Sequence, residues 1–362
     1  MSNDAHDTPG APAPPAVARG GLGTGLVLAV VSAVTFSLSG PLAAGLFATG
    51  WSPGAVVLVR VALGAVVLLP FGVVALRGDW APVRRNLRLL ALYGALGVAA
   101  TQFCYFAAVQ HMQVGPALLI EYSAPAAVVA WLWLRHGQRP GRATLAGLAL
   151  AAAGLVLVLD LTGARLDPVG VAWALGAMVG ASTYFVLNAR SGTGLPPLSL
   201  AAGGLVVGAV LLAVLAAVGI LPVTASTAAV GLAGAVVPVG AVLAALGVVT
   251  AGVAYVTGIA AGRRLGARPA SFVALLEVVS AVCFAWVLLD ELPRPVQLVG
   301  GLLVLAGVVV VQQGEAATRR TPPAVGPSLG TRPEAEAGTA TGTIEPAAGP
   351  AAATDVEPTG KP

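Results

Sequence analysis

Three ionisable side chains, Arg60, Glu121 and Glu277, each lie within a long stretch of apolar residues. A charge at the centre of a lipid bilayer costs about 3 kcal/mol or more, so such residues are candidate functional sites when their stretch spans a membrane. A buried carboxylate can bind a proton or an amine, and a guanidinium can bind a carboxylate. The three residues therefore predict a substrate pathway, with proton coupling as a hypothesis. The structural alternative is an Arg–Glu pair that only fixes helix packing.

The depths of the three residues suggest how they are arranged. Arg60 and Glu121 each lie about six residues, roughly 9 Å of helix, from the same end of their stretches, so the two side chains could pair. Glu277 lies about nine residues into its stretch from the opposite end, near the middle. We therefore expect both acids to face one central cavity.

Five polar or aromatic side chains within apolar stretches complete the predicted pathway: Gln102, Tyr105, Tyr122, Tyr184 and Tyr255. Each could hydrogen-bond a substrate or could instead bridge neighbouring helices.

The composition shows which elements must position these residues. The chain has 362 residues, of which 57% are hydrophobic and only 9% are charged, against about a quarter charged in soluble domains. Its apolar segments are close to the ~20 residues that a membrane helix needs, and they are too long for the strands of a membrane barrel. The sequence predicts an all-α polytopic membrane protein with ten transmembrane helices, at approximately 22–49, 54–76, 89–109, 114–134, 143–160, 168–188, 198–219, 239–262, 269–289 and 296–313. The apolar stretch 223–237 could add a re-entrant or interfacial piece.

The arginines predict the orientation, because cytoplasmic loops are rich in Arg and Lys. With the N-terminus inside, fourteen arginines lie on the cytoplasmic side and two, Arg165 and Arg294, lie outside. The cytoplasmic set is Arg19, Arg77, Arg84, Arg85, Arg88, Arg135, Arg139, Arg142, Arg190, Arg263, Arg264, Arg268, Arg319 and Arg320. Both termini are therefore expected in the cytoplasm, with the protein in the cytoplasmic membrane. Because the arginines lie in short loops, the net charge of +4 does not indicate nucleic-acid binding.

The chain also repeats itself at an offset of 153 residues. This shift places Pro116 on Pro269, Trp133 on Trp286 and Pro140 on Pro293. It also aligns three pairs of glycines: Gly94 with Gly247, Gly147 with Gly300, and Gly154 with Gly307. A repeat of five helices re-enters the membrane from the other side, so the two copies are inverted, as in many secondary transporters. We expect a disordered tail at 1–20, five-helix repeats at 21–160 and 161–313, and a disordered tail at 314–362.

Two long stretches carry a family resemblance. The first is YGALGVAATQFCYFAAVQHMQVGPALLIEYSAPAAVVAWLW with GLALAAAGLVLVLD, and the second is LGARPASFVALLEVVSAVCFAWVLLDELPRPVQLVGGLLVLAGVVVV. They resemble the two EamA-type repeats of the drug/metabolite transporter superfamily, and GAVVLVRVALGAVVLLP resembles the family's second helix. The resemblance covers about residues 21 to 313 and implies a ten-helix carrier that exports amino acids, metabolites or drugs. The Glu-Tyr-x-x-Pro stretch at Glu121 is most similar to the threonine/homoserine exporters.

This chain departs from that family at two places. Val278 stands where the second repeat often has Pro, and His136-Gly137-Gln138 replaces the usual acid after the fourth helix. The substrate is therefore not carried over from the resemblance.

Enzyme motifs are missing from the sequence. It has no Walker lysine, HExxH or GxSxG motif and no spacing typical of metal ligands, so neither a cofactor nor a metal is expected. We predict a secondary-active exporter of a small metabolite, such as an amino acid or an amphiphilic drug-like compound, that works by alternating access. Its expected partners are the substrate, protons and the lipid bilayer. The alternatives are a membrane-embedded lipid-processing enzyme or lipid flippase, and a scaffold or sensor that transports nothing.

Overall fold

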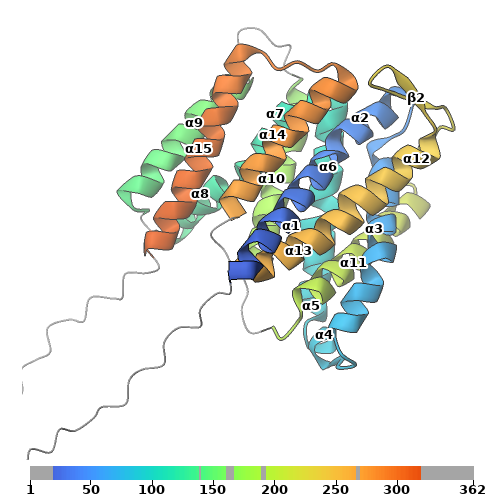
Figure 1. Cartoon of the computed structure of the whole chain (residues 1–362), viewed down its shortest axis with the longest axis horizontal. Coiled ribbons are helices and arrows are strands. Elements are labelled where there is room, and N and C mark those ends of the chain that lie inside the picture. The colour runs from blue at the N-terminus through green and yellow to red at the C-terminus, as the bar shows by residue number, and fades with distance from the viewer. Residues whose placement is uncertain (1–18, 138–139, 160–166, 189–192, 266–269, 319–362) are drawn as a thin grey trace, which may run out of the picture. The chain divides into compact units, whose positions relative to one another are not determined.

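The computed structural model describes residues 19–137, 140–159, 167–188, 193–265 and 270–318, and these are mostly helical (Figure 1). In the first part of the chain the elements are α1 (Arg19–Ser37), α2 (Ser39–Ala48), α3 (Pro53–Ala75), α4 (Ala81–Arg85), α5 (Leu87–Leu92), the π-helical η1 (Tyr93–Ala100), α6 (Thr101–His111), α7 (Val114–Tyr122), α8 (Ala124–His136) and α9 (Arg142–Leu159). In the second part they are α10 (Pro168–Asn188), α11 (Pro197–Ala217), β1 (Val230–Leu232), β2 (Ala235–Val237), α12 (Val239–Ala244), the π-helical η2 (Ala245–Val253), α13 (Ala254–Leu265), α14 (Ala270–Leu289) and α15 (Pro295–Thr318).

Among the described residues, six helices or runs of helices are long and apolar enough to cross a membrane. They are Gly23–Ala48, Pro53–Ala75, Leu87–His111, Val114–Arg135, Pro197–Ala217 and Val239–Ala261. Three shorter apolar helices, Arg142–Val158, Leu276–Leu289 and Pro295–Val311, accompany them.

The helices run back and forth between two ends of the bundle. At one end, which we call the His111 end, the Trp51 indole donates to the Ser226 carbonyl at 2.9 Å, and His111 Nδ1 lies 2.9 Å from Asp167 Oδ2. At the other end, which we call the Arg263 end, the Asn86 side chain donates to the Thr193 carbonyl at 2.8 Å. Connections that are far apart in the sequence are thus fastened together at each end.

The segments predicted at 22–49 and 114–134 agree with the apolar runs Gly23–Ala48 and Val114–Arg135, but each run is broken by a one-residue turn. The first break, at Leu38, separates α1 from α2, and the second, at Ser123, separates α7 from α8. Proline explains both breaks, because it lacks an N–H and its ring clashes with the carbonyl four residues earlier. Pro41 faces the Ser37 carbonyl and Pro125 faces that of Glu121. The second break therefore falls directly beside the acid.

The packing partners obey the 153-residue offset. The contact of α1 with α13 recurs, after the shift, as the contact of α10 with α6, and the contact of α3 with η2 recurs as that of α11 with η1. Three pairs are carried onto themselves: α7 with α14 and α9 with α15 at this offset, and α3 with α11 at a smaller one, since Gly247 packs on Leu63 and Gly94 on Val207. The π-helical segments η1 and η2 also coincide after the shift to within one residue. Two similar arrangements of helices therefore contact one another through equivalent surfaces.

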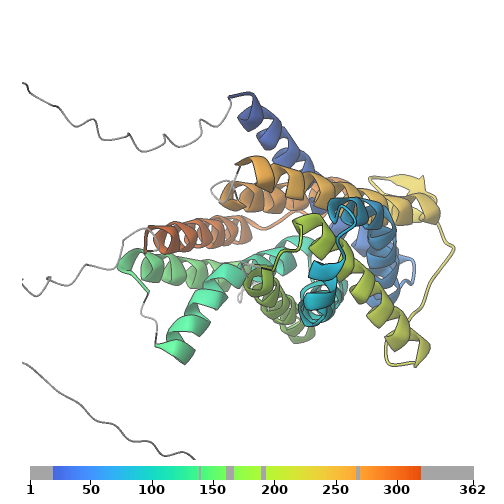
Figure 2. The same cartoon turned by 90° about the horizontal axis from the view of Figure 1, so that it is seen from below.

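The α9–α15 pair shows this equivalence most directly (Figures 1 and 2). A Cβ added to Gly154 would lie 2.7 Å from the Gly300 carbonyl oxygen, and one added to Gly300 would lie 2.8 Å from the Gly154 carbonyl oxygen. Gly147 and Gly307 approach one another in the same way, at 2.8 and 2.6 Å. The aligned glycines thus let the two backbones approach closely.

Residues 223–237, predicted as an apolar re-entrant or interfacial piece, include a hairpin of β1 and β2. Leu232 of the hairpin lies against Gly45 of α2, where an added Cβ would be 2.9 Å from its Cδ2 atom. The tails predicted as disordered at 1–20 and 314–362 lie almost wholly outside the described residues, as do Arg139, Arg165, Arg190, Arg268, Arg319 and Arg320. Helix begins at Arg19 and continues to Thr318, a few residues into each predicted tail.

Candidate functional site

Arg60 lies on α3 in the middle of the bundle, and its side chain is 1% exposed. Its Nε donates to Thr250 Oγ1 and its Nη2 to the Thr250 carbonyl, each at 3.1 Å, while Nη1 donates to Gln102 Oε1. The guanidinium carbon lies 5.0 Å from the centre of the Phe36 ring and 5.6 Å from that of Phe106, within the range of a cation–π contact. Arg60 therefore ties the first half of the chain to η2 in the second half.

The direct Arg60–Glu121 pair that the matching depths suggested is not formed. Within the described part of the chain, the only carboxylate and basic side chain within 4 Å of one another are those of Asp167 and His111. The hydrogen bonds of Arg60 go to Gln102 and Thr250 instead, and Glu121 is only partly buried. Glu121 and Glu277 still lie close enough to Arg60 to interact with its charge through space.

Glu277 of α14 is the most enclosed acid of the site, at 8% exposure. The Tyr122 hydroxyl, at the end of α7, hydrogen-bonds its carboxylate. Oxygen Oε1 of Glu277 has no hydrogen-bond partner among the described residues. Burying a polar atom without a partner costs free energy, so this oxygen is a candidate position for a proton or for a ligand's donor group.

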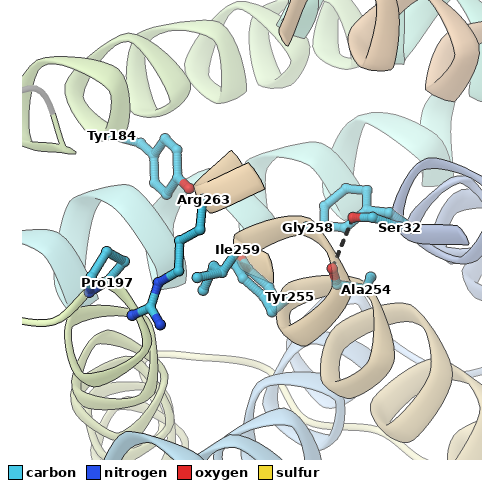
Figure 3. Close-up of a pocket in the computed structure, with 9 residues that line it drawn as sticks. Ser32, Tyr184, Pro197, Ala254, Tyr255, Gly258, Ile259 and Arg263 are labelled. Carbon is cyan, nitrogen blue, oxygen red and sulfur yellow. Dashed lines mark hydrogen bonds between the residues drawn. The ribbon is translucent and has the colours of Figure 1, made fainter. Parts of the chain in front are cut away.

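A cavity of about 500 Å³ reaches into the bundle from the Arg263 end (Figure 3). Its wall combines three aromatic side chains, Phe36, Tyr184 and Tyr255, with the small residues Ser32 and Gly258; Pro197, Ala254, Ile259 and Arg263 complete it. Phe36 and Tyr255 pack edge to face with ring centres 6.3 Å apart. Because Phe36 also contacts the Arg60 guanidinium, this aromatic wall lies between the cavity and the buried charges.

The opposite end is packed more closely. A pocket between α7 and α14 measures only about 10 Å³, and Glu291 closes it by accepting the Val114 N–H at 3.2 Å. Burial raises the pKa of Glu291, although the Val114 N–H opposes this. Asp167 Oδ1 accepts the Val169 N–H at 2.9 Å, and this bond, helped by His111, lowers the pKa of the carboxyl. The cavity thus opens at the Arg263 end.

The structure places the eight residues of the sequence-predicted site in three groups. Arg60 and Gln102 bond directly, and Tyr105 is buried beside them, with its hydroxyl against Gly40. Tyr122 meets Glu277, and Glu121 lies one residue before Tyr122 on the same helix end. Tyr184 and Tyr255 line the cavity, and Tyr184 also packs on Tyr93 with ring centres 5.3 Å apart.

Sequence reasoning missed four residues that shape the site: Phe36, Phe106, Thr250 and Arg263. The phenylalanines and the threonine are ordinary membrane-helix residues, so nothing in the sequence separates them from their neighbours. Arg263 was visible but was interpreted only as an orienting charge. No cluster of three or more His, Cys, Asp or Glu side chains suited to a metal occurs among the residues that the structure describes.

Comparison with known proteins gives a family match over most of the chain. The sequence profile described as the EamA-like transporter family matches residues 23–160 and, a second time, residues 168–312. Two matches in tandem agree with the repeated packing of the helices.

Individual relatives are more distant. The chain is 28% identical over 185 residues to the threonine/homoserine exporter RhtA of Salmonella typhimurium strain SL1344, and 26% identical over the same length to RhtA of Escherichia coli K12. Each match covers 50% of this chain and 58% of the exporter's length. A solved structure titled only as the crystal structure of a protein has a TM-score of 0.51 and 21% identity, covers 83% of this chain and 99% of its own, and so supports the fold alone.

Proposed function

Since this chain belongs to the EamA-like transporter family, we propose that it is a secondary-active carrier that exports a small metabolite, such as an amino acid or an amphiphilic drug-like compound, by alternating access. It is a multi-pass membrane protein, which in bacteria resides in the cell membrane. Family membership indicates a transporter rather than an enzyme. The proposal goes beyond family membership, because it also names the direction of transport, the substrate class and the residues that bind the substrate.

The proposal includes a topology. Ten membrane spans would arise if the shorter helices and α10 cross the membrane together with the six long apolar runs. The excess of arginines at the Arg263 end supports a cytoplasmic location for that end and for both termini. On this assignment the two repeats, 21–160 and 161–313, enclose a substrate route, and the cavity lies open to the cytoplasm, where an exporter collects its cargo.

The observation that carries the proposal is the unpartnered Oε1 of Glu277. This oxygen lies more than nine-tenths buried beside Tyr122 and within reach of the charges of Arg60 and Glu121. A buried carboxylate with one unpartnered oxygen is stabilised by binding a proton or a cation there. The amino group of a substrate is such a cation, and a proton could replace it after release, which would couple export to the proton gradient.

The substrate that fits these groups best is a zwitterionic amino acid. The acids Glu121 and Glu277 suit its ammonium group, and a guanidinium suits its carboxylate. RhtA, the relative that matches about half of this chain, is named as an exporter of threonine and homoserine. Both of those compounds are small, hydroxylated and zwitterionic, and they are the first candidates to test.

The test is a metabolite-release assay in bacterial cells that overproduce the wild-type protein or one of three variants: Glu277→Gln, Glu121→Gln and Arg60→Ala. We expect the wild type to release threonine, homoserine or another amino acid faster than cells without it. Glu277→Gln should abolish release that depends on the pH gradient, because the amide keeps the shape of the side chain but binds neither a proton nor an ammonium. Glutamine at position 121, which is less enclosed, should reduce release to a smaller extent.

Protein yield in the membrane and melting temperature in detergent separate lost transport from lost folding, above all for Arg60→Ala, which leaves Gln102 and Thr250 without their partner. Equal release by the wild type and both Gln variants would remove the acids from the pathway. A change in lipid composition without any release would favour a lipid-processing enzyme or flippase instead.

A further inference from the structure

The last turn of α13 carries two adjacent arginines with different surroundings. Arg263 lines the cavity, whereas Arg264 is not among the residues of its wall and donates Nη1 to the Ala260 carbonyl of its own helix at 3.1 Å. Both side chains are exposed. Orientation of the protein in the membrane requires only that a positive charge lies at this surface. It does not explain why Arg263 lines the cavity.

No described residue engages the Arg263 side chain. In the part of the chain that the structure describes, its guanidinium has no hydrogen bond and no carboxylate within 4 Å. Figure 3 shows its side chain extending beside Ile259 toward Pro197 at the mouth of the cavity. The nine residues of the cavity wall include no acid, so Arg263 is the fixed charge of this wall.

The rest of the wall fits a small organic molecule. The volume of about 500 Å³ lies within the ~300–1,000 Å³ that is usual for small-molecule sites. Tyr184 and Tyr255 offer ring faces, and Tyr255 also offers a hydroxyl group, whereas the Ser32 hydroxyl donates to the Ala254 carbonyl at 2.8 Å. A guanidinium binds a carboxylate through two parallel N–H···O bonds, and it binds an uncharged or cationic molecule far less well.

We infer that Arg263 forms a carboxylate-binding site at the cytoplasmic mouth of the cavity, where an exported substrate with a carboxylate is first held. The inference rests on the proposed function and narrows its substrate class to carboxylate-bearing compounds, in particular zwitterions. The carboxylate binds at Arg263 and the ammonium group points inward, toward the aromatic wall of Phe36, Tyr184 and Tyr255 and the acids beyond it. Selection for the carboxylate at the mouth thus precedes binding of the amine at Glu277.

The experiment uses inside-out membrane vesicles, whose outer face presents the cytoplasmic end to the medium. Uptake of L-threonine is compared with uptake of L-threonine amide, which keeps the amine and the hydroxyl but lacks the carboxylate. Arg263→Ala should raise the half-saturation concentration for threonine by about ten- to a hundredfold, as expected for a lost charge-assisted pair, with little change in maximal rate. The amide should be unaffected, and Arg263→Lys should restore part of the affinity.

Arg264→Ala is the matched control, because it removes the same charge one residue away, on the same helix and at the same membrane surface. It should leave both half-saturation concentrations unchanged. Equal effects of the two alanine variants, or an equal loss for threonine and its amide, would overturn the assignment of Arg263.

A wild-type protein that takes up neither compound refutes the proposed amino-acid export. Carboxylate binding at Arg263 is then tested separately. Purified wild type, Arg263→Ala and Arg264→Ala are then titrated with threonine, homoserine and their amides while melting temperature is followed. Stabilisation by the acids that is lost only in Arg263→Ala supports the site. Stabilisation that is the same in all three proteins, or absent from all three, refutes it.

Discussion

The two halves of the chain, 23–160 and 168–312, share one packing scheme but differ in the straightness of their helices. In the first half, Pro41 and Pro125 break helices between α1 and α2 and between α7 and α8. The equivalent of Pro125 in the second half is Val278, and α14 runs unbroken through it from Ala270 to Leu289. The acid of the first half lies beside a helix break, whereas that of the second half lies inside a continuous helix. Equivalent helices therefore present their acids in unequal ways.

The same comparison explains why the cavity lies at one end. Tyr105 of α6 corresponds to Gly258 of α13 at the 153-residue offset. Tyr105 is buried, and its hydroxyl fills the space over Gly40 near the His111 end, while Gly258, which has no side chain, lies against Ser32 in the cavity wall at the Arg263 end. A symmetric set of helices thus encloses an asymmetric cavity, because the residue that fills one end is absent from the other. In a carrier that alternates, this difference in filling favours the state open at the Arg263 end.

The most direct way to break this asymmetry is Gly258→Tyr, which gives the second half the residue of the first. Its Cβ would lie 2.6 Å from Ser32 Oγ, so the ring must either enter the cavity or displace α1, and export should fall to the level of cells without the protein. Gly240→Tyr is the control, because Gly240 is exposed and a Cβ added there meets no atom within 4 Å. Amino-acid release is measured along with membrane yield, and undiminished release by Gly258→Tyr would mean that substrate does not pass through this cavity.

A milder change tests the same space in a protein that still folds. A Cβ at Gly258 would lie 2.6 Å from Ser32 Oγ but 3.6 Å from Ser32 Cβ. Gly258→Ala should therefore slow export, and Ser32→Ala in the same chain should restore it. Failure of the second substitution to help would show that the clash is not with Ser32.

Arg60 is the second difference between the halves, since α11, the counterpart of α3, contains no charged residue. Thr250→Val removes the Oγ1 that accepts Arg60 Nε and so weakens the link between the halves. Because hydrogen bonds to charged groups contribute about 1.5–3 kcal/mol, we expect unfolding free energy in detergent to fall by that amount. Thr144→Val is the contrasting variant, because Thr144 is equally buried but its Oγ1 has no partner in the described structure. Thr144→Val should be neutral or stabilising. Equal losses of unfolding free energy in the two variants would show that the hydrogen bond from Arg60 to Thr250 contributes nothing to stability.

Sequence reasoning was accurate where a physical rule acts on one residue at a time. Apolar length identified the helical segments, and the aligned glycines identified the close pair α9 and α15. Arg60 and Glu277, chosen as charges within apolar stretches, are both buried, and their place in a substrate pathway stays a prediction. It was wrong about the Arg60–Glu121 pair, because matching depth fixes only height along the helices, and rotation about their axes brings Gln102 and Thr250 to the guanidinium instead. It also gave Arg263 one role, since a loop arginine looks the same whether it faces water or a cavity. Lateral contacts of this kind depend on tertiary packing, which a single sequence does not display.

The α9–α15 contact tests whether the halves are equivalent where they look most alike. Gly154→Ala and Gly300→Ala each place a Cβ against the other helix's backbone, so each should destabilise the protein by about 1–3 kcal/mol, as overpacking does. The two losses should be similar, and the double variant should cost less than their sum, since one separation of the helices relieves both clashes. Unfolding in detergent measures all three against Gly23→Ala, where an added Cβ meets nothing within 4 Å. Very unequal losses would mean that the two faces of the contact are not equivalent.

The smallest expected effect concerns closure of the His111 end by Glu291. Its pKa is raised in the folded protein by burial, so the folded state holds the proton more tightly than the unfolded state does. The resulting stability is fully present below the ordinary value of 4.5 and is lost as pH rises through the raised pKa. The melting temperature should therefore fall by a few degrees over that interval, and Glu291→Gln should flatten the fall.

Asp290→Asn is the neighbouring control, since Asp290 is exposed and asparagine also tolerates its φ of +59°. Asp167, whose pKa is lowered, acts in the opposite direction and at lower pH, where its stabilising contacts are lost as pH falls. If the fall in melting temperature persists in Glu291→Gln, the carboxyl of Glu291 is not its source, and the proposed closure by Glu291 is wrong.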